Sequence, residues 1–420
     1  MQSGKNKLLK SNLRLITFFL YSLPSIPLAA AQIAVYIAVP AIYSKIAAVG
    51  IGITGLVIMI SRVIDMITDP ILGTYLDRMV EKIGWKFWLL IGFPLISIGI
   101  FILFNPLDAL EIFSLLLGII FVTLGWTFFS IPWWGIGIAI SNSNSNDRFK
   151  VVSFRELLTI PGVILGLFLI HFSNISGEIF LIISILFLSP LFIKKIPIPN
   201  ISNKKGTSYF LNIKNLFKDN SNFKYLCLSY FFIGLSNGVT SILFILFVEF
   251  IIGGSPQNFL SIYFISAFIG LPFVYMLASK YNKKRIWTSF ILLACICFLP
   301  VVFLSTNSTT LFMVICIISG FCLSADLIIP SSIQADIIYN EQQKNKNVLV
   351  GKIYSVWSFI QKLSLALSAG VCLPLLGYFG FNPSEVNTQL LPLSFAYGII
   401  PIILRIPAII CAENIILKDL

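Results

Sequence analysis

A short run of charged residues lies inside an otherwise apolar stretch of the chain. The sequence SRVIDMITDP places Arg62, Asp65 and Asp69 at spacings i, i+3 and i+7, which fall on one face of an α-helix. A charge at the centre of a bilayer costs at least about 2.5–3.5 kcal/mol, so such side chains must face protein or water and find partners. Two carboxylates beside one guanidinium leave a surplus negative charge, which indicates a site for a small cation.

Lys362, in the apolar sequence WSFIQKLS, is a candidate to neutralise that surplus. A cation entering between Asp65 and Asp69 would displace the Lys362 ammonium or the Arg62 guanidinium. Cation binding would then bias which face of a central cavity is open. The alternative is a fixed ion-pair network that only holds the helices together.

Other polar and aromatic residues at membrane depth leave two interpretations open. Asp326 must face protein or water by the same cost, either in a gate pair or in a structural pair. Arg405 is interpreted as a structural residue, whose side chain could extend towards the cytoplasm while its stem packs. Trp133 and Trp134 either pack in the core or against lipid, or stack on the apolar face of a sugar.

The composition excludes several classes of protein. Of 420 residues, 57% are hydrophobic and 11% are charged, against about 25% charged in soluble domains. The one histidine, His171, and seven cysteines without a CxxC pair favour neither a metal site nor disulfides. No catalytic constellation is found outside the carboxylates described above, so we expect neither an enzyme nor a cofactor.

Hydropathy predicts twelve membrane-spanning helices, because about 20 apolar residues cross a bilayer. The polar, basic segment 1–11 is not expected to be a cleaved signal peptide. The predicted spans are 13–43, 48–76, 87–104, 109–140, 151–172, 177–193, 223–250, 257–279, 286–304, 309–339, 348–378 and 389–411.

The basic residues gather in alternate loops, which orients the chain. Most Lys and Arg lie at the N-terminus, in the even-to-odd loops and at the C-terminal tail, whereas the opposite loops hold Lys45 and several acids. By the positive-inside rule both termini are cytoplasmic. The net charge of +12 is thus a topology signal with the lipid bilayer as its partner, and no nucleic-acid role is expected.

The longest polar stretch, 194–222, divides the chain into two six-helix halves, 1–193 and 223–420. Spans 4 and 10 each carry a central proline, Pro132 and Pro330. Twelve spans with a long central loop resemble the major facilitator superfamily, an all-α membrane fold of two bundles around a cavity.

Four stretches of sequence resemble the glycoside–pentoside–hexuronide:cation symporter family, which includes melibiose permease. They are SRVIDMITDPILGTYLDR with KIGWKFWLLIG, IPWWGIGIAI with DRFKVVSFRE, ADLIIPSSIQADII, and GKIYSVWSFIQKLSLALSAG. These stretches sample both halves of the chain. The resemblance implies the two-bundle fold and symport of a solute with Na⁺, Li⁺ or H⁺.

The resemblance also implies roles for individual residues. Asp65 and Asp69 match the cation ligands of the family, and Thr127 on the fourth span matches a hydroxyl ligand. Lys362 matches the lysine that couples cation and sugar sites. Trp134 and Arg155 match positions that line the sugar site.

Three positions depart from the family pattern. Ser130 replaces the aspartate of the fourth span, so its hydroxyl becomes the candidate cation ligand there. Thr68 replaces an asparagine between the two carboxylates. The acid of the first span that bonds galactoside hydroxyls is replaced in the apolar stretch around Leu28 and Ala29.

We therefore expect a monomeric, multi-pass transporter of the cell inner (plasma) membrane. It would couple Na⁺ or H⁺ to symport of a small organic solute, a sugar or glycoside, by alternating access. One alternative is a lipid or lysophospholipid transporter on the same scaffold. A second alternative is a non-transporting membrane sensor.

Overall fold

The structure is a computed structural model of the whole chain. It describes residues 14–33, 35, 39–43, 57, 60, 64, 68, 71–73, 75, 79–80, 82–108, 110–141, 145–171, 176–193, 217, 220–344, 350–379, 381 and 390–416.

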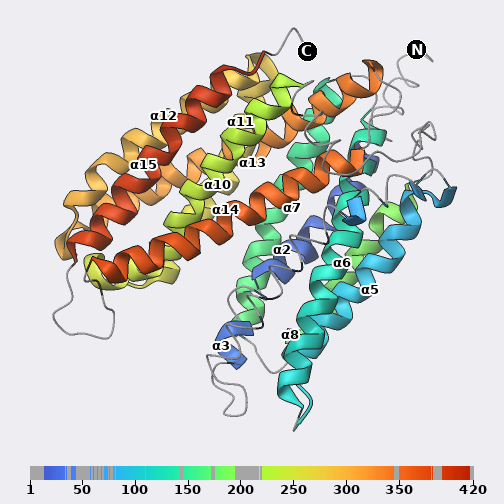
Figure 1. Ribbon diagram of the computed structural model, residues 1–420, viewed down its shortest axis with the longest axis horizontal. Helices are drawn as coiled ribbons and strands as arrows, with labels where there is room; N and C mark the ends of the chain where they lie inside the picture. The colour runs from blue at the N-terminus through green and yellow to red at the C-terminus, as the bar shows by residue number, and fades with distance from the viewer. Residues whose placement is uncertain are drawn as a thin grey trace, which may run out of the picture. The chain divides into compact units, whose positions relative to one another are not determined.

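The described residues form helices and contain no strand. This follows from the composition, because a helix satisfies its own backbone groups where no water can. The helices in Figure 1 are α2 (Ser25–Ile33), α3 (Val39–Tyr43), α5 (Trp85–Phe104), α6 (Glu111–Ile140), α7 (Ser145–His171), α8 (Ser176–Ser184), η3 (Ile185–Phe192), α10 (Ser221–Phe247), η4 (Val248–Ile252), α11 (Pro256–Lys280), α12 (Lys283–Phe298), η5 (Leu299–Phe303), η6 (Thr306–Ser308), α13 (Thr309–Lys344), α14 (Val350–Tyr378) and α15 (Leu391–Glu413).

The chain divides into two compact units. Unit 1 holds Met1–Lys204 with Ile338–Val356, and unit 2 holds Lys205–Ile337 with Trp357–Leu420. The division after Lys204 falls inside the polar stretch 194–222. The C-terminal end of α13 and the first turns of α14 are grouped with unit 1.

Small residues bring the helices of unit 1 close together. Helix α5 packs along α6, and a Cβ at Gly92 would lie 2.7 Å from the backbone nitrogen of Phe129. Helix α7 packs on α2 in the same way, with Gly162 against the backbone of Ile26. Glycine at such contacts lets helix backbones approach each other, which is how helices associate in membranes.

Unit 2 is built around α10, which packs against α15 and α14. Gly238 of α10 meets Ser368 of α14, and the Ser368 hydroxyl donates to the carbonyl of Leu235 at 3.0 Å. Helix α13 packs on α11 where Gly320 lies against the backbone of Tyr263. These contacts fix the positions of the polar side chains that face the interior of unit 2.

An aromatic cluster fills one part of the unit 2 core. Phe247 of α10 stacks on Tyr397 of α15 with ring centroids 4.2 Å apart, and Phe312 of α13 packs against both rings. Stacked and tilted pairs of this kind each add about 0.5–1.5 kcal/mol beyond the buried area. These ring contacts help to hold α10, α13 and α15 together.

The predicted spans match the helices closely. Each predicted span except 48–76, which falls mostly outside the described residues, corresponds to a described helix. Among the described residues, eight helices are long and apolar enough to cross a membrane, with a shorter apolar helix at Gly177–Phe192. Pro132 and Pro330 lie inside α6 and α13 as predicted.

Two boundaries differ from the prediction. Helix α7 begins at Ser145 and not at 151, and α13 continues to Lys344 beyond 339. Hydropathy treats these polar residues as loop, yet they belong to helix ends. Asp147 lies in the first turn of α7, where a carboxylate is stabilised by the positive end of the helix dipole.

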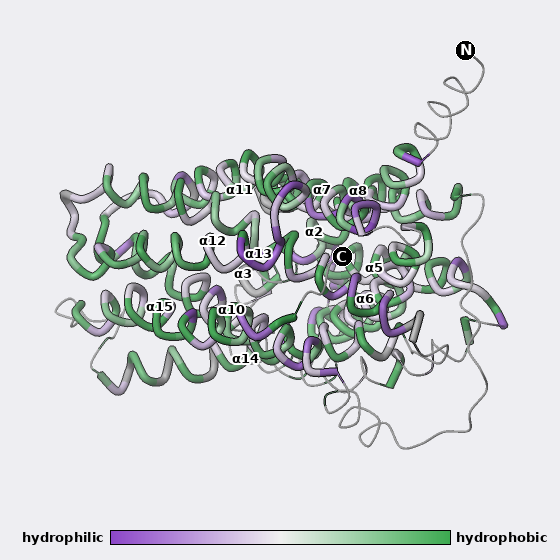
Figure 2. The backbone as a smooth tube through the Cα atoms, turned by 90° about the horizontal axis from the view of Figure 1, so that it is seen from above, coloured by the Kyte–Doolittle hydropathy of each residue, from purple (hydrophilic) through white to green (hydrophobic). Residues whose placement is uncertain are grey.

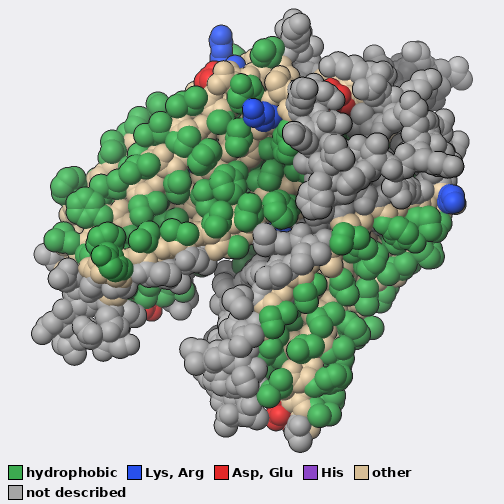
Figure 3. All heavy atoms as spheres, in the orientation of Figure 1, with side chains coloured by type: hydrophobic (Ala, Val, Ile, Leu, Met, Phe, Trp, Pro, Cys, Tyr) green, Lys and Arg blue, Asp and Glu red, His purple; other side chains and the backbone are tan. Residues whose placement is uncertain are grey.

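The surface of both units is apolar. Large side chains such as Ile182, Phe192 and Phe303 are 72%, 73% and 86% exposed. Figure 2 shows apolar residues along the lengths of the helices, and Figure 3 shows hydrophobic side chains over most of the described surface on the face that it presents. Patches of this size need a non-aqueous environment, so this all-α protein is built for a bilayer.

Candidate functional site

The predicted cation ligands are only partly within the described residues. Arg62, Asp65 and Asp69 lie outside them. Thr127 and Ser130 lie one turn apart on α6, where their residues are 1% and 2% exposed. The Thr127 hydroxyl donates to the carbonyl of Thr123 at 3.3 Å. Two buried hydroxyl oxygens on one helix face are suitable ligands for a hard cation.

The two residues expected to line a sugar site lie near a shared tyrosine in unit 1. The rings of Trp134, on α6, and Tyr354, on the first turns of α14, are 5.3 Å apart and tilted by 42°. Arg155 of α7 is close enough to Tyr354 to interact with it electrostatically. Tyr354 is buried, whereas Trp134 is half-buried.

Arg155 is held in a neutral pair. Its Nη2 and Nε atoms lie 2.7 and 3.0 Å from the Oε1 atom of Glu156. The guanidinium lies 5.9 Å from the centre of the Trp133 ring and is hydrogen-bonded to the Tyr21 side chain. Charge-assisted bonds of this length are among the strong ones in proteins, so Arg155 is a fixed group.

The two neighbouring tryptophans have different environments. Trp133 is buried, its Nε1 atom donates to the carbonyl of Tyr21 at 2.7 Å, and its ring stacks on that of Tyr21 at 5.4 Å. Trp133 therefore anchors α6 to the helical segment Arg14–Ile33, which contains Tyr21. Trp134 is the half-buried one of the two, which leaves part of its ring surface available to a solute.

We define the Arg155 cluster by its members in unit 1: Tyr21, Trp133, Trp134, Arg155, Glu156 and Tyr354. Sequence reasoning did not assign Tyr21, Glu156 or Tyr354. Glu156 follows Arg155 directly, a spacing at which side chains on a helix do not usually face each other. Tyr354 lies in the stretch GKIYSVWSFIQK. In this stretch a role was predicted for Lys362 and not for Tyr354.

A second polar cluster lies inside unit 2. The Nε1 atom of Trp287 donates to Oδ1 of Asp326 at 3.0 Å, and Nη2 of Arg405 lies 3.8 Å from Oδ2. Arg405 also donates to Ser236 at 3.1 Å and to Asn237 at 2.9 Å. We call Ser236, Asn237, Trp287, Asp326 and Arg405 the Asp326 cluster.

Arg405 packs inside unit 2. Its side chain is 12% exposed, hydrogen-bonds to α10 and lies beside Asp326 of α13. The reason is that acceptors on neighbouring helices lie within reach. For Asp326, the basic partner lies in the same unit, which is the geometry of a pair inside one bundle.

Lys362 lies on α14 in unit 2 and is half-buried. One turn earlier, Trp357 stacks on Tyr230 of α10 with ring centroids 3.8 Å apart, which holds this part of α14 in place. The predicted partners of Lys362, Asp65 and Asp69, lie outside the described residues.

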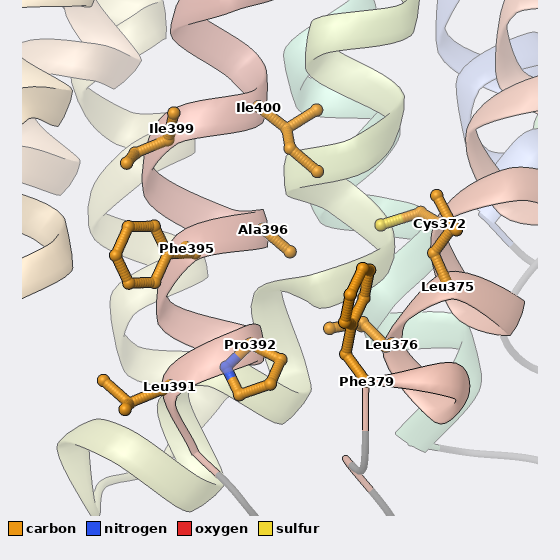
Figure 4. Close-up of a pocket in the computed structure, with 10 residues that line it drawn as sticks. All are labelled: Cys372, Leu375, Leu376, Phe379, Leu391, Pro392, Phe395, Ala396, Ile399 and Ile400. Atoms are coloured by element: carbon orange, nitrogen blue, oxygen red, sulfur yellow. The ribbon is translucent and has the colours of Figure 1, made fainter.

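An apolar groove of about 500 Å³ lies between the end of α14 and the start of α15 (Figure 4). Cys372, Phe379, Pro392 and Phe395 are among its lining side chains, and no described lining residue is charged or carries a hydroxyl or an amide. A sugar needs a few placed polar groups to orient it, so we do not assign the sugar site to this groove.

The sequence matches the model of the MFS/sugar transport protein family over residues 20–412. The uncharacterized symporter YjmB of Bacillus subtilis is 23% identical over 393 residues, covering 88% of this chain and 84% of the relative. The raffinose carrier protein of Pediococcus pentosaceus is 24% identical over 267 residues, or 56% of this chain and 41% of the carrier.

Solved structures share the fold. The transporter FucP in the outward conformation superposes with a TM-score of 0.70 at 16% identity, covering 96% of this chain and 99% of that one. A structure of a point variant of the Escherichia coli fucose:proton symporter FucP gives 0.68 at 15% identity, covering 96% and 98%. At this identity the likeness establishes the major facilitator fold.

Proposed function

This chain belongs to the MFS/sugar transport protein family, and on that premise we propose that it carries a sugar or glycoside together with Na⁺ or H⁺. It is a multi-pass membrane transporter of the major facilitator fold. In this fold the two halves rock around a central site so that the site opens to each side in turn. We place it in the cell inner membrane as a monomer with both termini cytoplasmic.

The Arg155 cluster is the observation that carries the sugar assignment. A sugar ring has an apolar face that stacks on an indole and hydroxyl groups that bond to fixed polar groups. Trp134 offers the partly exposed ring, next to the Tyr354 ring at 5.3 Å. The Arg155 charge is already balanced by Glu156 at 2.7 Å. The cluster therefore suits an uncharged, hydroxyl-rich solute better than an anion.

The cation would bind beside the same helix. Asp65 and Asp69 would supply carboxylate oxygens. The buried hydroxyls of Thr127 and Ser130 lie on α6 about two turns and one turn before Trp134. Lys362 would couple the cation to the solute, and Arg62 would balance the charge of the two carboxylates. Because the ion and solute residues share α6, occupancy of one site changes the position of the other, which is the physical requirement for coupling.

The test is uptake by the purified chain in proteoliposomes. We would offer radiolabelled raffinose, other neutral glycosides, a hexuronate and lysophosphatidylcholine, and would vary the Na⁺, Li⁺ and pH gradients independently. We expect accumulation of a neutral glycoside under an inward Na⁺ or H⁺ gradient and none without a gradient. Gradient-driven movement of lysophosphatidylcholine alone would replace the sugar assignment by lipid transport, and no movement of any probe would favour a sensor.

A further inference from the structure

Helix α13 carries two buried aspartates in contrasting settings. Asp336 is fully buried and its Oδ2 atom lies 2.7 Å from Nζ of Lys283, which also donates to the Ser332 hydroxyl at 2.9 Å. This is a short, charge-assisted bond to an ammonium. Asp326, 8% exposed and about three turns earlier, has no such bond.

The contacts of Asp326 come mostly from neutral groups. Oδ1 accepts from the Trp287 indole at 3.0 Å, and the Asn237 side chain is a further hydrogen-bond partner. Oδ2 lies 3.8 Å from Nη2 of Arg405, which is beyond hydrogen-bond length. Arg405 gives its hydrogen bonds to Ser236 and Asn237 instead.

Arg405 retains unused donor capacity. Its Nη1 atom is buried and has no hydrogen-bond partner among the described residues. The pair is thus held at a distance where a direct bond could form only if one side chain moved. If the Asp326–Arg405 pair had only a structural role, we would expect a direct hydrogen bond between the two side chains, because unpaired buried polar groups are costly.

The surrounding helices add no second full charge next to Asp326 among the described residues. Tyr263 of α11, Cys295 of α12 and Cys322 of α13 are the other titratable groups near the carboxyl, and α10 contributes the amide and hydroxyl of Asn237 and Ser236. Arg405 is the charged neighbour on α15. Burial favours the neutral form of Asp326, whereas the Arg405 guanidinium and the hydrogen bonds from Trp287 and Asn237 favour the charged form.

We propose that Asp326 is a proton-binding site within unit 2, separate from the cation ligands predicted at Asp65 and Asp69. One proton adds to Oδ2 and converts the carboxylate to a carboxylic acid, with no other bond made or broken. The addition of the proton does not itself require the bonds from Trp287 to Oδ1 or from Arg405 to Ser236 and Asn237 to break. The net charge of the cluster rises from zero to one positive charge, centred on Arg405.

The added positive charge is expected to affect how the helices around Arg405 pack. A buried guanidinium without a counter-charge is costly, so the protonated cluster favours any arrangement in which Arg405 meets water or an anion. Proton binding at Asp326 is then linked to a change in the packing of α10, α13 and α15. This goes beyond the proposed sugar symport, since it predicts a pH-dependent transition even with no solute or metal cation present.

Infrared spectroscopy of the reconstituted full chain tests the proposal without any transport measurement. A protonated carboxyl has its own C=O stretching band, which isotope labelling of aspartate identifies. We expect such a band to appear as the pH is lowered and to disappear as it is raised. Asp326→Asn should abolish it, whereas the matched variant Asp336→Asn should leave it in place.

Two further variants keep the outcomes distinct. Trp287→Phe removes the donor to Oδ1 and should shift the frequency of the band, which tests the assignment even if Asp326→Asn does not fold. Asp65→Asn/Asp69→Asn should retain the band, so failure of the cation assignment does not affect this result. A titrating band that is unchanged in both Asp326→Asn and Trp287→Phe, or no titrating carboxyl band at all, would overturn the proposal.

Discussion

The Arg155 cluster of unit 1 and the Asp326 cluster of unit 2 use the same residue types to different ends. Each places an arginine, a carboxylate and a tryptophan among apolar helices. In unit 1 the guanidinium lies 2.7 Å from its carboxylate, whereas in unit 2 the shortest such distance is 3.8 Å. In unit 1 the tryptophan N–H of Trp133 bonds to a backbone carbonyl, and in unit 2 that of Trp287 bonds to the carboxylate itself.

This difference shows that composition alone does not define what a buried ion pair does. A direct pair is a fixed, neutral support, and in unit 1 it stands beside the half-buried ring of Trp134. A pair held apart by neutral hydrogen bonds leaves its carboxyl free to change charge. The first geometry suits recognition of a solute, and the second suits binding of a proton.

The largest effect should come from breaking the direct pair. Arg155→Ala leaves the Glu156 carboxylate, whose side chain is 13% exposed, without its cation, and should lower the free energy of unfolding by about 3–5 kcal/mol. Arg155→Ala/Glu156→Gln should recover a large part of that loss. Denaturant unfolding in detergent measures both, and equal losses in the two variants would show that the pair is not a fixed support.

The two tryptophan donors can be compared directly. Trp287→Phe removes a bond to a carboxylate, worth about 1.5–3 kcal/mol, and Trp133→Phe removes a bond to a neutral carbonyl, worth about 0.5–1.5 kcal/mol. The difference should be present where Asp326 is ionised and shrink as the pH falls and Asp326 takes up a proton. Unfolding of both variants at several pH values checks this, and a constant difference would count against a titrating Asp326.

A smaller effect is expected on solute affinity. Trp134→Ala should weaken binding of the transported sugar about tenfold, or ~1.4 kcal/mol, because a stacking surface is lost. Trp126→Ala, a half-buried tryptophan two turns earlier on α6, is the matched control. Solute counterflow in proteoliposomes measures the apparent affinity, and equal changes in the two variants would remove Trp134 from the solute site.

The last effect concerns the Ser236 hydroxyl of the unit 2 cluster. Ser236→Ala removes the acceptor for Nε of Arg405 and the donor to the Pro401 carbonyl. We expect a loss of about 2 kcal/mol in unfolding free energy, since each of the two net hydrogen bonds contributes about 1 kcal/mol. A loss of unfolding free energy as large as that of Arg155→Ala would mean that Ser236 stabilises the Arg405 side chain far more than one hydrogen bond between them can explain.

Much of the fold could be predicted from the sequence, because hydrophobic length and helix formation are local properties. The ends of α5 and α15 lie within two residues of the predicted spans. The start of α7 was wrong because hydropathy does not distinguish a polar helical turn from a loop. The polar ends of long helices are therefore the least predictable part of this fold.

The candidate sites were less accessible to sequence reasoning. Burial cost indicated that Asp326 needs a partner, but the choice of partner depends on packing between distant helices, and the sequence did not pair Asp326 with Arg405. Trp134 and Arg155 were identified through resemblance, and their shared neighbour Tyr354 emerged only when the start of α14 was placed beside α6 in unit 1. The sequence gives the residue types and the free-energy cost of burying their charges. It does not give the distances between side chains, which decide their chemistry.

The central claim, a cation-driven sugar transporter, is tested most directly by uptake with the variant Asp65→Asn/Asp69→Asn. With an imposed Na⁺ or H⁺ gradient, the wild-type chain should accumulate the sugar above its external concentration, and the variant should not. Exchange of internal for external sugar without a gradient should survive in the variant. Full gradient-driven accumulation by the variant would contradict the account.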